Sequence, residues 1–100
     1  MFIKVAKSSD ISEGQLRYFM ANDQKVAVAR IDGELFCVND RCSHEECSLS
    51  DGWTEEKNIV CPCHGSSFDM KTGKVLSLPA TSDIAAYEIK EESGNILVNI

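Results

Sequence analysis

The sequence predicts an all-β fold, an antiparallel β-sandwich or barrel. Short segments recur at regular spacing, turn-forming residues separate them, and no stretch has the pattern of a long helix. A chain of 100 residues with 43% hydrophobic composition can bury one core but not two. We therefore expect a single domain over residues 1–100, and no internal repeat is visible.

The first part of the chain is predicted to form strands joined by turns. Ile3 and Val5 flank Lys4, which is the alternation of a half-buried strand. Asp32-Gly33 is the strongest short-range hairpin signal, because both residues tolerate positive φ. Residues 8–14 are expected to form a polar turn, which can include a single helical turn. The expected strands cover residues 2–7, 16–20, 26–31 and 34–38.

The second part is predicted to continue in the same way and to close the sheet. In the last segment Ile96, Val98 and Ile100 share one face, which marks it as a strand. Residues 49–53 are expected to turn outward, and residues 77–80 to form a loop. The expected strands cover residues 58–60, 68–70, 74–76, 84–91 and 95–100.

Two segments each carry one cysteine and one histidine. Cys42 and His44 form a C-x-H motif, and Cys61 and His64 form a C-x-x-H motif. Thiolate and imidazole are ligands that zinc and iron favour, so one of each on both segments predicts a metal held between two loops. A structural zinc site could use the same four residues, but zinc motifs usually pair like ligands within one half.

The pattern closely resembles that of the Rieske [2Fe–2S] family. Cys47 and the run C-P-C-H-G-S-S-F-D over residues 61–69 extend the resemblance beyond the two motifs. It implies a base of antiparallel sheets, of the Rieske iron–sulfur protein type, with a cluster-binding subdomain inserted at about residues 40–76. It also implies one [2Fe–2S] cluster per chain.

The resemblance assigns roles to the ligand residues. Cys42 and Cys61 would hold one iron as thiolates, and His44 and His64 would hold the other. Two neutral imidazoles in place of thiolates make reduction easier. The histidines would lie nearest the solvent, where the electron leaves.

Further residues match positions that tune Rieske centres. Cys47 and Cys63 lie where some members have a disulfide, although two free thiols in a reducing cytoplasm remain the alternative. Ser66 matches a hydroxyl that donates to a cluster sulfide, whereas Phe68 stands where a tyrosine donates in higher-potential members. Pro79 lies in the loop that covers the cluster in the family.

Charge and cysteine content narrow the class of protein. Sixteen acidic residues against ten basic ones give a net charge of −6, which disfavours nucleic acid and anionic membranes and favours a basic partner surface. No apolar run approaches the ~20 residues of a membrane span, so we expect a soluble, cytoplasmic protein. Five cysteines, an odd number, favour metal ligation over a disulfide scaffold. Cys37 is predicted to be a small buried apolar residue.

The resemblance points to a soluble Rieske-type ferredoxin of a bacterial ring-hydroxylating dioxygenase system. Such a monomer would carry single electrons from a flavin reductase to a terminal oxygenase and would not itself be an enzyme. Cys47, Cys63 and Ser66 instead favour the Rieske subunit of a quinol-oxidising complex, against which stands the acidic pair Glu45-Glu46 at the loop tip. We expect that pair to meet a basic partner. The small subunit of a nitrite reductase and a zinc-binding structural module are further alternatives.

Overall fold

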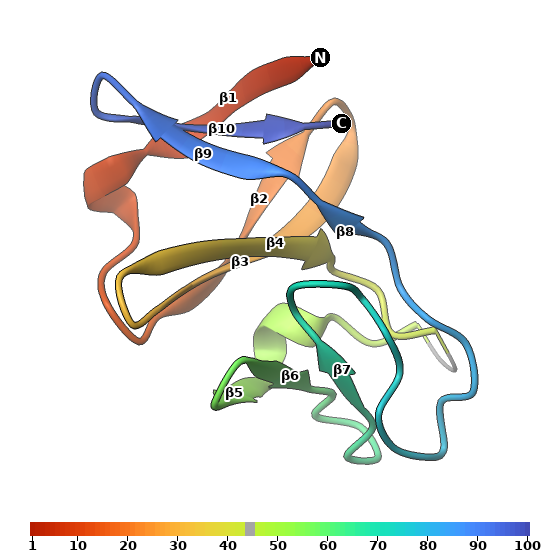
Figure 1. The fold of residues 1–100 in the computed structure, drawn as a ribbon. Coiled ribbons are helices and arrows are strands. Elements are labelled where there is room, and N and C mark those ends of the chain that lie inside the picture. Colours follow the sequence, from red (N-terminus) through yellow and green to blue (C-terminus); the bar gives the residue numbers. More distant parts are fainter. Residues whose placement is uncertain (44–45) are drawn as a thin grey trace.

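Ten short strands form three antiparallel sheets in the computed structural model, which describes residues 1–43 and 46–100 (Figure 1). Two single turns of 3-10 helix accompany the strands, so the predicted all-β class is confirmed. The first sheet has the order β1 (Phe2–Lys7), β10 (Asn95–Asn99), β9 (Ile89–Glu92). The second has the order β2 (Leu16–Ala21), β3 (Gln24–Ile31), β4 (Glu34–Asn39), β8 (Ala86–Tyr87), and the third the order β5 (Trp53–Glu55), β6 (Asn58–Val60), β7 (Ser67–Asp69). The helical turns are η1 (Ser8–Asp10) and η2 (Leu49–Asp51).

The second sheet is buried on both faces. In β3, Val26 and Val28 pack into the core shared with the first sheet, whereas Ala27 and Ala29 pack into the core shared with the third. Neighbouring residues of a strand point to opposite faces, so this continuous apolar run serves two cores. The second sheet therefore lies between the first sheet and the lobe that carries the cysteine and histidine motifs. The first and second sheets together are called the base.

This lobe is an insertion between two paired strands. β4 and β8 are hydrogen-bonded neighbours, with Cys37 opposite Tyr87, yet residues 40–85 lie between them in the sequence. Figure 1 shows this stretch as a separate lobe, yellow-green through green to blue, below the two sheets of the base. The observed stretch contains the predicted subdomain of about residues 40–76, whose own boundaries remain a prediction.

Most predicted strands are confirmed within one or two residues, but two predictions for the second half are wrong. The predicted strand 84–91 is two strands, because Ala86–Tyr87 pairs with β4 while Ile89–Glu92 pairs with β10 in the other sheet. Residues 74–76 form no strand beyond one bridge, between Val75 and Phe68. The segment 49–53 begins with Leu49 buried in the core between base and lobe and, as predicted, reaches the surface at Asp51 and Trp53.

An ion pair fastens the two sheets of the base. The Arg30 guanidinium in β3 donates to both carboxylate oxygens of Glu91 in β9, at 2.9 and 3.1 Å. Arg30 also donates to the backbone carbonyls of Ser8 and Ile11. The hydrogen bond from Arg30, with a further one from Ser8, lowers the pKa of Glu91 below its usual value.

Candidate metal centre

Each cysteine of the two motifs begins a loop that its own backbone closes. The Cys42 N–H donates to the Cys47 carbonyl at 3.0 Å, and the Cys61 N–H donates to the Ser66 carbonyl at 2.7 Å. Cys61 directly follows β6, so a short extended strand delivers it to the loop. Gly65 turns this second loop with a φ of 81°, a conformation that glycine adopts without steric cost.

The described ligand candidates differ sharply in burial. Cys42 and Cys61 are 2% and 0% exposed and belong to the same core, between base and lobe. The His64 side chain is exposed. The structure thus places both thiols inside and this imidazole outside, which is the arrangement that the resemblance implies. The fourth candidate, His44, lies outside the described residues, as does Glu45.

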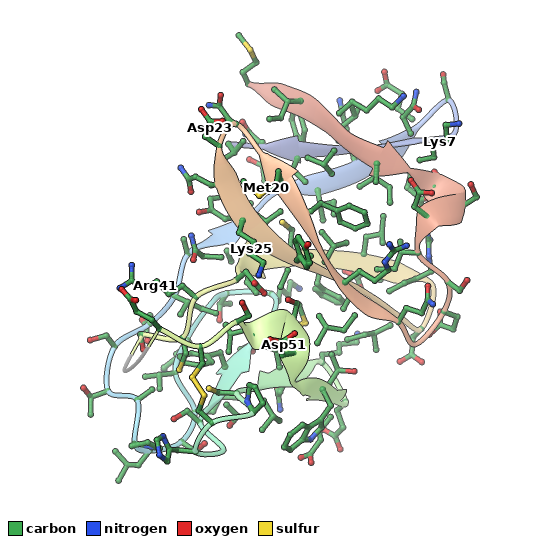
Figure 2. The ribbon with its side chains drawn as sticks, turned by 180° about the vertical axis from the view of Figure 1, so that it is seen from behind. Lys7, Met20, Asp23, Lys25, Arg41 and Asp51 are labelled. Atoms are coloured by element: carbon green, nitrogen blue, oxygen red, sulfur yellow. A yellow bond between two sulfur atoms is a disulfide. The ribbon has the colours of Figure 1, made fainter. Side chains whose placement is uncertain are left out.

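A disulfide joins the two loops. Cys47 and Cys63 are bonded, with their Cα atoms 6.5 Å apart, and Figure 2 shows the yellow sulfur–sulfur bond in the lobe. Cys47 is half-buried and Cys63 exposed, so the bond lies at the surface of the lobe. The Sγ atom of Cys61 lies within 4.8 Å of both bonded sulfurs. The bridged form of the two loops is thus the one that the structure contains.

The Ser66 hydroxyl ties the proline loop to the second ligand loop. Its Oγ is fully buried and accepts the Ala80 N–H at 3.0 Å. The peptide bond between Leu78 and Pro79 is cis, and the Pro79 side chain is exposed. Because Oγ acts as acceptor toward Ala80, the hydroxyl proton remains available as a donor. Its role toward a cluster sulfide stays a prediction.

Phe68 and Cys37 both have packing roles. Phe68 is fully buried, lies opposite Ile59 in the third sheet, and belongs to the core that holds Cys42 and Cys61. Cys37 belongs to the other core, and burial raises the pKa of its thiol to about 12. Cys37 therefore stays a protonated thiol, as the prediction of a small buried apolar residue requires.

Asp40 and Lys25 fix the start of the first ligand loop, and neither was predicted to do so. The buried Asp40 accepts the Ser50 N–H through Oδ1 at 2.7 Å, and its carbonyl accepts the Leu49 N–H. Its Oδ2 accepts no hydrogen bond but lies 3.3 Å from Lys25 Nζ, which also donates to Ser48 Oγ at 2.8 Å. Lys25 is labelled in Figure 2, on β3 next to the lobe. Nothing local in the sequence marks these partners, because β3 and the loop are far apart in the chain.

The described donors fit an iron–sulfur cluster. Two fully buried thiolates would be costly without a positive partner, and a cluster of two ferric irons supplies one. The exposed imidazole of His64 would add a neutral nitrogen donor on the solvent side of these thiols. Among residues 1–43 and 46–100 no helix is long and apolar enough to cross a membrane.

Comparisons with known proteins identify the family to which the chain belongs. The family model of the Rieske [2Fe–2S] domain matches residues 1–88. The 3-phenylpropionate/cinnamic acid dioxygenase ferredoxin subunit of Shigella flexneri serotype 5b (strain 8401) is 39% identical over 94 residues, covering 92% of this chain and 87% of that protein.

Solved structures show the same likeness. The ferredoxin of carbazole 1,9a-dioxygenase from Nocardioides aromaticivorans IC177 superposes with a TM-score of 0.92 at 28% identity, covering 98% of this chain and 96% of that one. A chain in the complex of reduced oxygenase and oxidized ferredoxin in carbazole 1,9a-dioxygenase has a TM-score of 0.88 at 30% identity, covering 97% of this chain and 91% of that one.

The chain therefore belongs to the Rieske [2Fe–2S] family, and its cofactor is a [2Fe–2S] cluster. More particularly, its relatives are the ferredoxins of dioxygenase systems, and this chain is likewise a ferredoxin, an electron carrier and not itself an enzyme. This favours the ferredoxin hypothesis over the quinol-oxidising, nitrite-reductase and zinc-module alternatives.

Proposed function

We propose that this chain accepts single electrons from a flavin reductase and passes them to a terminal aromatic-ring-hydroxylating oxygenase. The observation that carries the proposal is the contrast in burial between the thiols of Cys42 and Cys61 and the imidazole of His64. The names of the relatives support the oxygenase as a partner, since one structure pairs an oxygenase with its ferredoxin. We place the carrier in the cytoplasm as a monomer.

We assign the cluster ligands to Cys42, His44, Cys61 and His64. When bound, a [2Fe–2S] cluster supplies a one-electron couple. Cys42 and Cys61, which lie in the core between base and lobe, would supply its thiolate ligands. His64 lies at the surface, so as a ligand it would provide the route by which an electron leaves the protein. The disulfide between Cys47 and Cys63 holds the two ligand loops together.

The ligand assignment is tested by metal analysis. The purified protein should contain two irons and two acid-labile sulfides per chain. His64→Cys exchanges a neutral ligand for an anionic one and should lose the cluster or lower its potential. Zinc in place of iron and sulfide, or a His64→Cys variant with the native potential, would contradict the assignment.

The partner assignment is tested by electron-transfer kinetics. Glu46 is exposed at the first ligand loop and pairs with Arg41. With a net charge of −6 the chain is expected to dock on a basic surface, so Glu46→Lys should slow transfer, and added salt should slow the wild type. The probes are the reductase and oxygenase of a dioxygenase system with a related ferredoxin.

A matched control separates docking from general charge. Glu92→Lys makes the same charge change in the first sheet, away from the lobe, where Glu92 pairs with Lys90. Its transfer rate should stay near that of the wild type. Equal rates for Glu46→Lys and the wild type at every salt concentration would place the docking surface elsewhere.

A further inference from the structure

The second sheet has an open edge at β2. This strand is the first in the order β2, β3, β4, β8, so it pairs with β3 on one side only. The Arg30 N–H of β3 donates to the carbonyl of Gln15, directly before β2. Hydrogen-bonded residues alternate along an antiparallel pair, so the odd-numbered residues of β2 bond to β3. The even-numbered residues direct their N–H and C=O groups to the open side, and these are Leu16, Tyr18 and Met20.

This edge is accessible and partly apolar. Among the described residues, no hydrogen bond reaches the outward backbone groups of β2. The side chains of Tyr18 and Met20 are 54% and 56% exposed. Residues 16–20 line a groove of about 490 Å³ together with Ser50 and Asp51 of η2, and Figure 2 labels Met20 and Asp51 on the two elements. Unpaired backbone groups and exposed apolar side chains thus lie together at the surface.

The other sheet edges are protected against pairing with another strand. Proteins keep edge strands from pairing by making them short, by charging them or by adding a bulge. β8 has two residues, and β5 and β7 have three each. Three of the four residues of β9 are charged, and β1 carries two lysines and an irregularity between Lys4 and Ala6. β2 has six residues and a single charge, Arg17, so it is the least protected edge of the described chain.

We propose that β2 pairs antiparallel with β2 of a second copy of this chain, about a two-fold axis at Tyr18. In this register the outward groups of Leu16 meet those of Met20 in the second copy, and Tyr18 meets Tyr18. A register shifted by two residues would leave one of these three residues without a partner. The side chains on this face then form only apolar and aromatic cross-strand pairs, which stabilise antiparallel sheets. The second sheet would continue from one copy into the other.

The charges of β2 are compatible with a second copy. The same register places Arg17 opposite Phe19 of the second copy, so the two arginines do not face each other. Within one chain the Arg17 guanidinium already lies 5.5 Å from the centroid of the Phe19 ring, a contact that attracts a cation to an aromatic face. The net charge of −6 on each copy opposes the pairing, so we expect a weak and reversible dimer. The carrier is then a monomer when dilute, and the proposal does not rest on the proposed function.

Sedimentation velocity of the holoprotein at increasing concentration tests the pairing. The average mass should rise from that of one chain toward that of two. Added salt should strengthen the association, because it screens the repulsion between two acidic copies. The mass of one chain at every concentration would overturn the proposal and leave the edge to a strand of another protein. Growth beyond two chains would also overturn it, because a two-fold pair closes on itself.

A charge placed on the edge should prevent the pairing. Met20→Lys puts an ammonium group opposite Leu16 of the second copy and should raise the dissociation constant at least tenfold. Leu76→Lys is the matched control, because Leu76 is an exposed apolar residue of the lobe and the charge change is the same. It should associate like the wild type. Cluster absorbance and circular dichroism confirm that both variants fold, and a Met20→Lys variant with native association would overturn the proposal.

Cysteine cross-linking tests the register. Tyr18→Cys places two thiols at the two-fold axis, where Cα atoms of a hydrogen-bonded antiparallel pair are about 5.5 Å apart, a separation that a disulfide spans. Oxidised glutathione, which takes up two electrons and two protons for each disulfide formed, should convert this variant to a covalent dimer on non-reducing electrophoresis. Arg17→Cys faces Phe19 instead and should cross-link at least tenfold more slowly. Equal rates for the two variants would overturn the register.

Discussion

At the residue scale, the buried hydroxyl of Ser66 is placed to tune the redox potential. Its Oγ accepts the Ala80 N–H, so its proton can be donated toward the ligand loop. A neutral hydrogen bond is worth about 0.5–1.5 kcal/mol, so Ser66→Ala should lower the midpoint potential of the one-electron couple by about 20–60 mV. A redox titration followed by visible absorbance measures this shift.

A neighbouring serine provides the control for that prediction. The Ser67 hydroxyl pairs with Ser77 Oγ at 2.9 Å, and Ser67 points to the opposite face of β7 from the buried Phe68. Ser67→Ala should therefore shift the midpoint potential by clearly less than Ser66→Ala does. Equal shifts in the two variants would remove the assigned role from Ser66.

Also at this scale, the pair of Lys25 and Asp40 should stabilise the first ligand loop. Lys25→Met leaves a buried carboxylate without its cation, and we expect it to destabilise the protein by about 1–3 kcal/mol. Adding Asp40→Asn to Lys25→Met removes the unpaired charge but keeps an acceptor for the Ser50 N–H. The double variant should therefore recover part of the stability that Lys25→Met loses. Chemical unfolding of the four proteins measures the coupling, and strictly additive losses would contradict it.

At the scale of elements, Gly52 allows the third sheet to pack beside η2. A Cβ atom added to Gly52 would lie 1.9 Å from the carbonyl oxygen of Val60, the residue before Cys61. Trp53 also pairs with Val60 across β5 and β6. Gly52→Ala must therefore displace β6, and overpacking of this kind costs about 1–3 kcal/mol or more.

The expected result is earlier loss of the cluster on heating, measured by its visible absorbance. Gly14→Ala serves as the control, because Gly14 has a φ of 83° but no atom within 4 Å of the added Cβ. Gly14→Ala should therefore cost only the backbone strain of about 1–2 kcal/mol. Gly14 lies in the base, away from the ligand loops. If Gly52→Ala kept its cluster as well as Gly14→Ala does, the close approach would not position the ligand loop.

At the scale of the whole molecule, the ion pair of Arg30 and Glu91 links the two sheets of the base, and its contribution to stability depends on pH. The hydrogen bond from Arg30 lowers the pKa of Glu91 below its ordinary value of 4.5. A carboxylate with a lowered pKa stabilises the folded state above the unfolded pKa, and this contribution is lost as the pH falls through the folded value. The wild type should thus exceed Glu91→Gln in stability at neutral pH.

Chemical unfolding at a series of pH values tests this dependence. The difference in unfolding midpoint between the wild type and Glu91→Gln should shrink as the pH is lowered below about 4.5. Glu91 is partly exposed, so solvent screening keeps its contribution modest. A difference that stayed constant with pH would show that the charge of Glu91 does not stabilise the fold.

The sequence by itself determined the all-β class, most strand positions and the family. These follow from local information: alternation with period two, the Asp32-Gly33 turn, and the spacing of Cys42, Cys61 and His64. Such signals lie within a few residues of one another, and the chemistry of thiolate and imidazole donors depends on residue type. The match of the family model to residues 1–88 confirms the family.

Tertiary structure alone decided which face each segment covers and which distant groups meet. Residues 84–91 alternate like one strand, but pairing with β4 and then with β10 divides them between two sheets. The partners of Asp40 on β3, and the approach of Cys61 to the disulfide, depend on how the lobe packs on the base. Such contacts join residues far apart in the chain. A local pattern cannot specify them, because close packing depends on the side chains of all the elements that meet in the core.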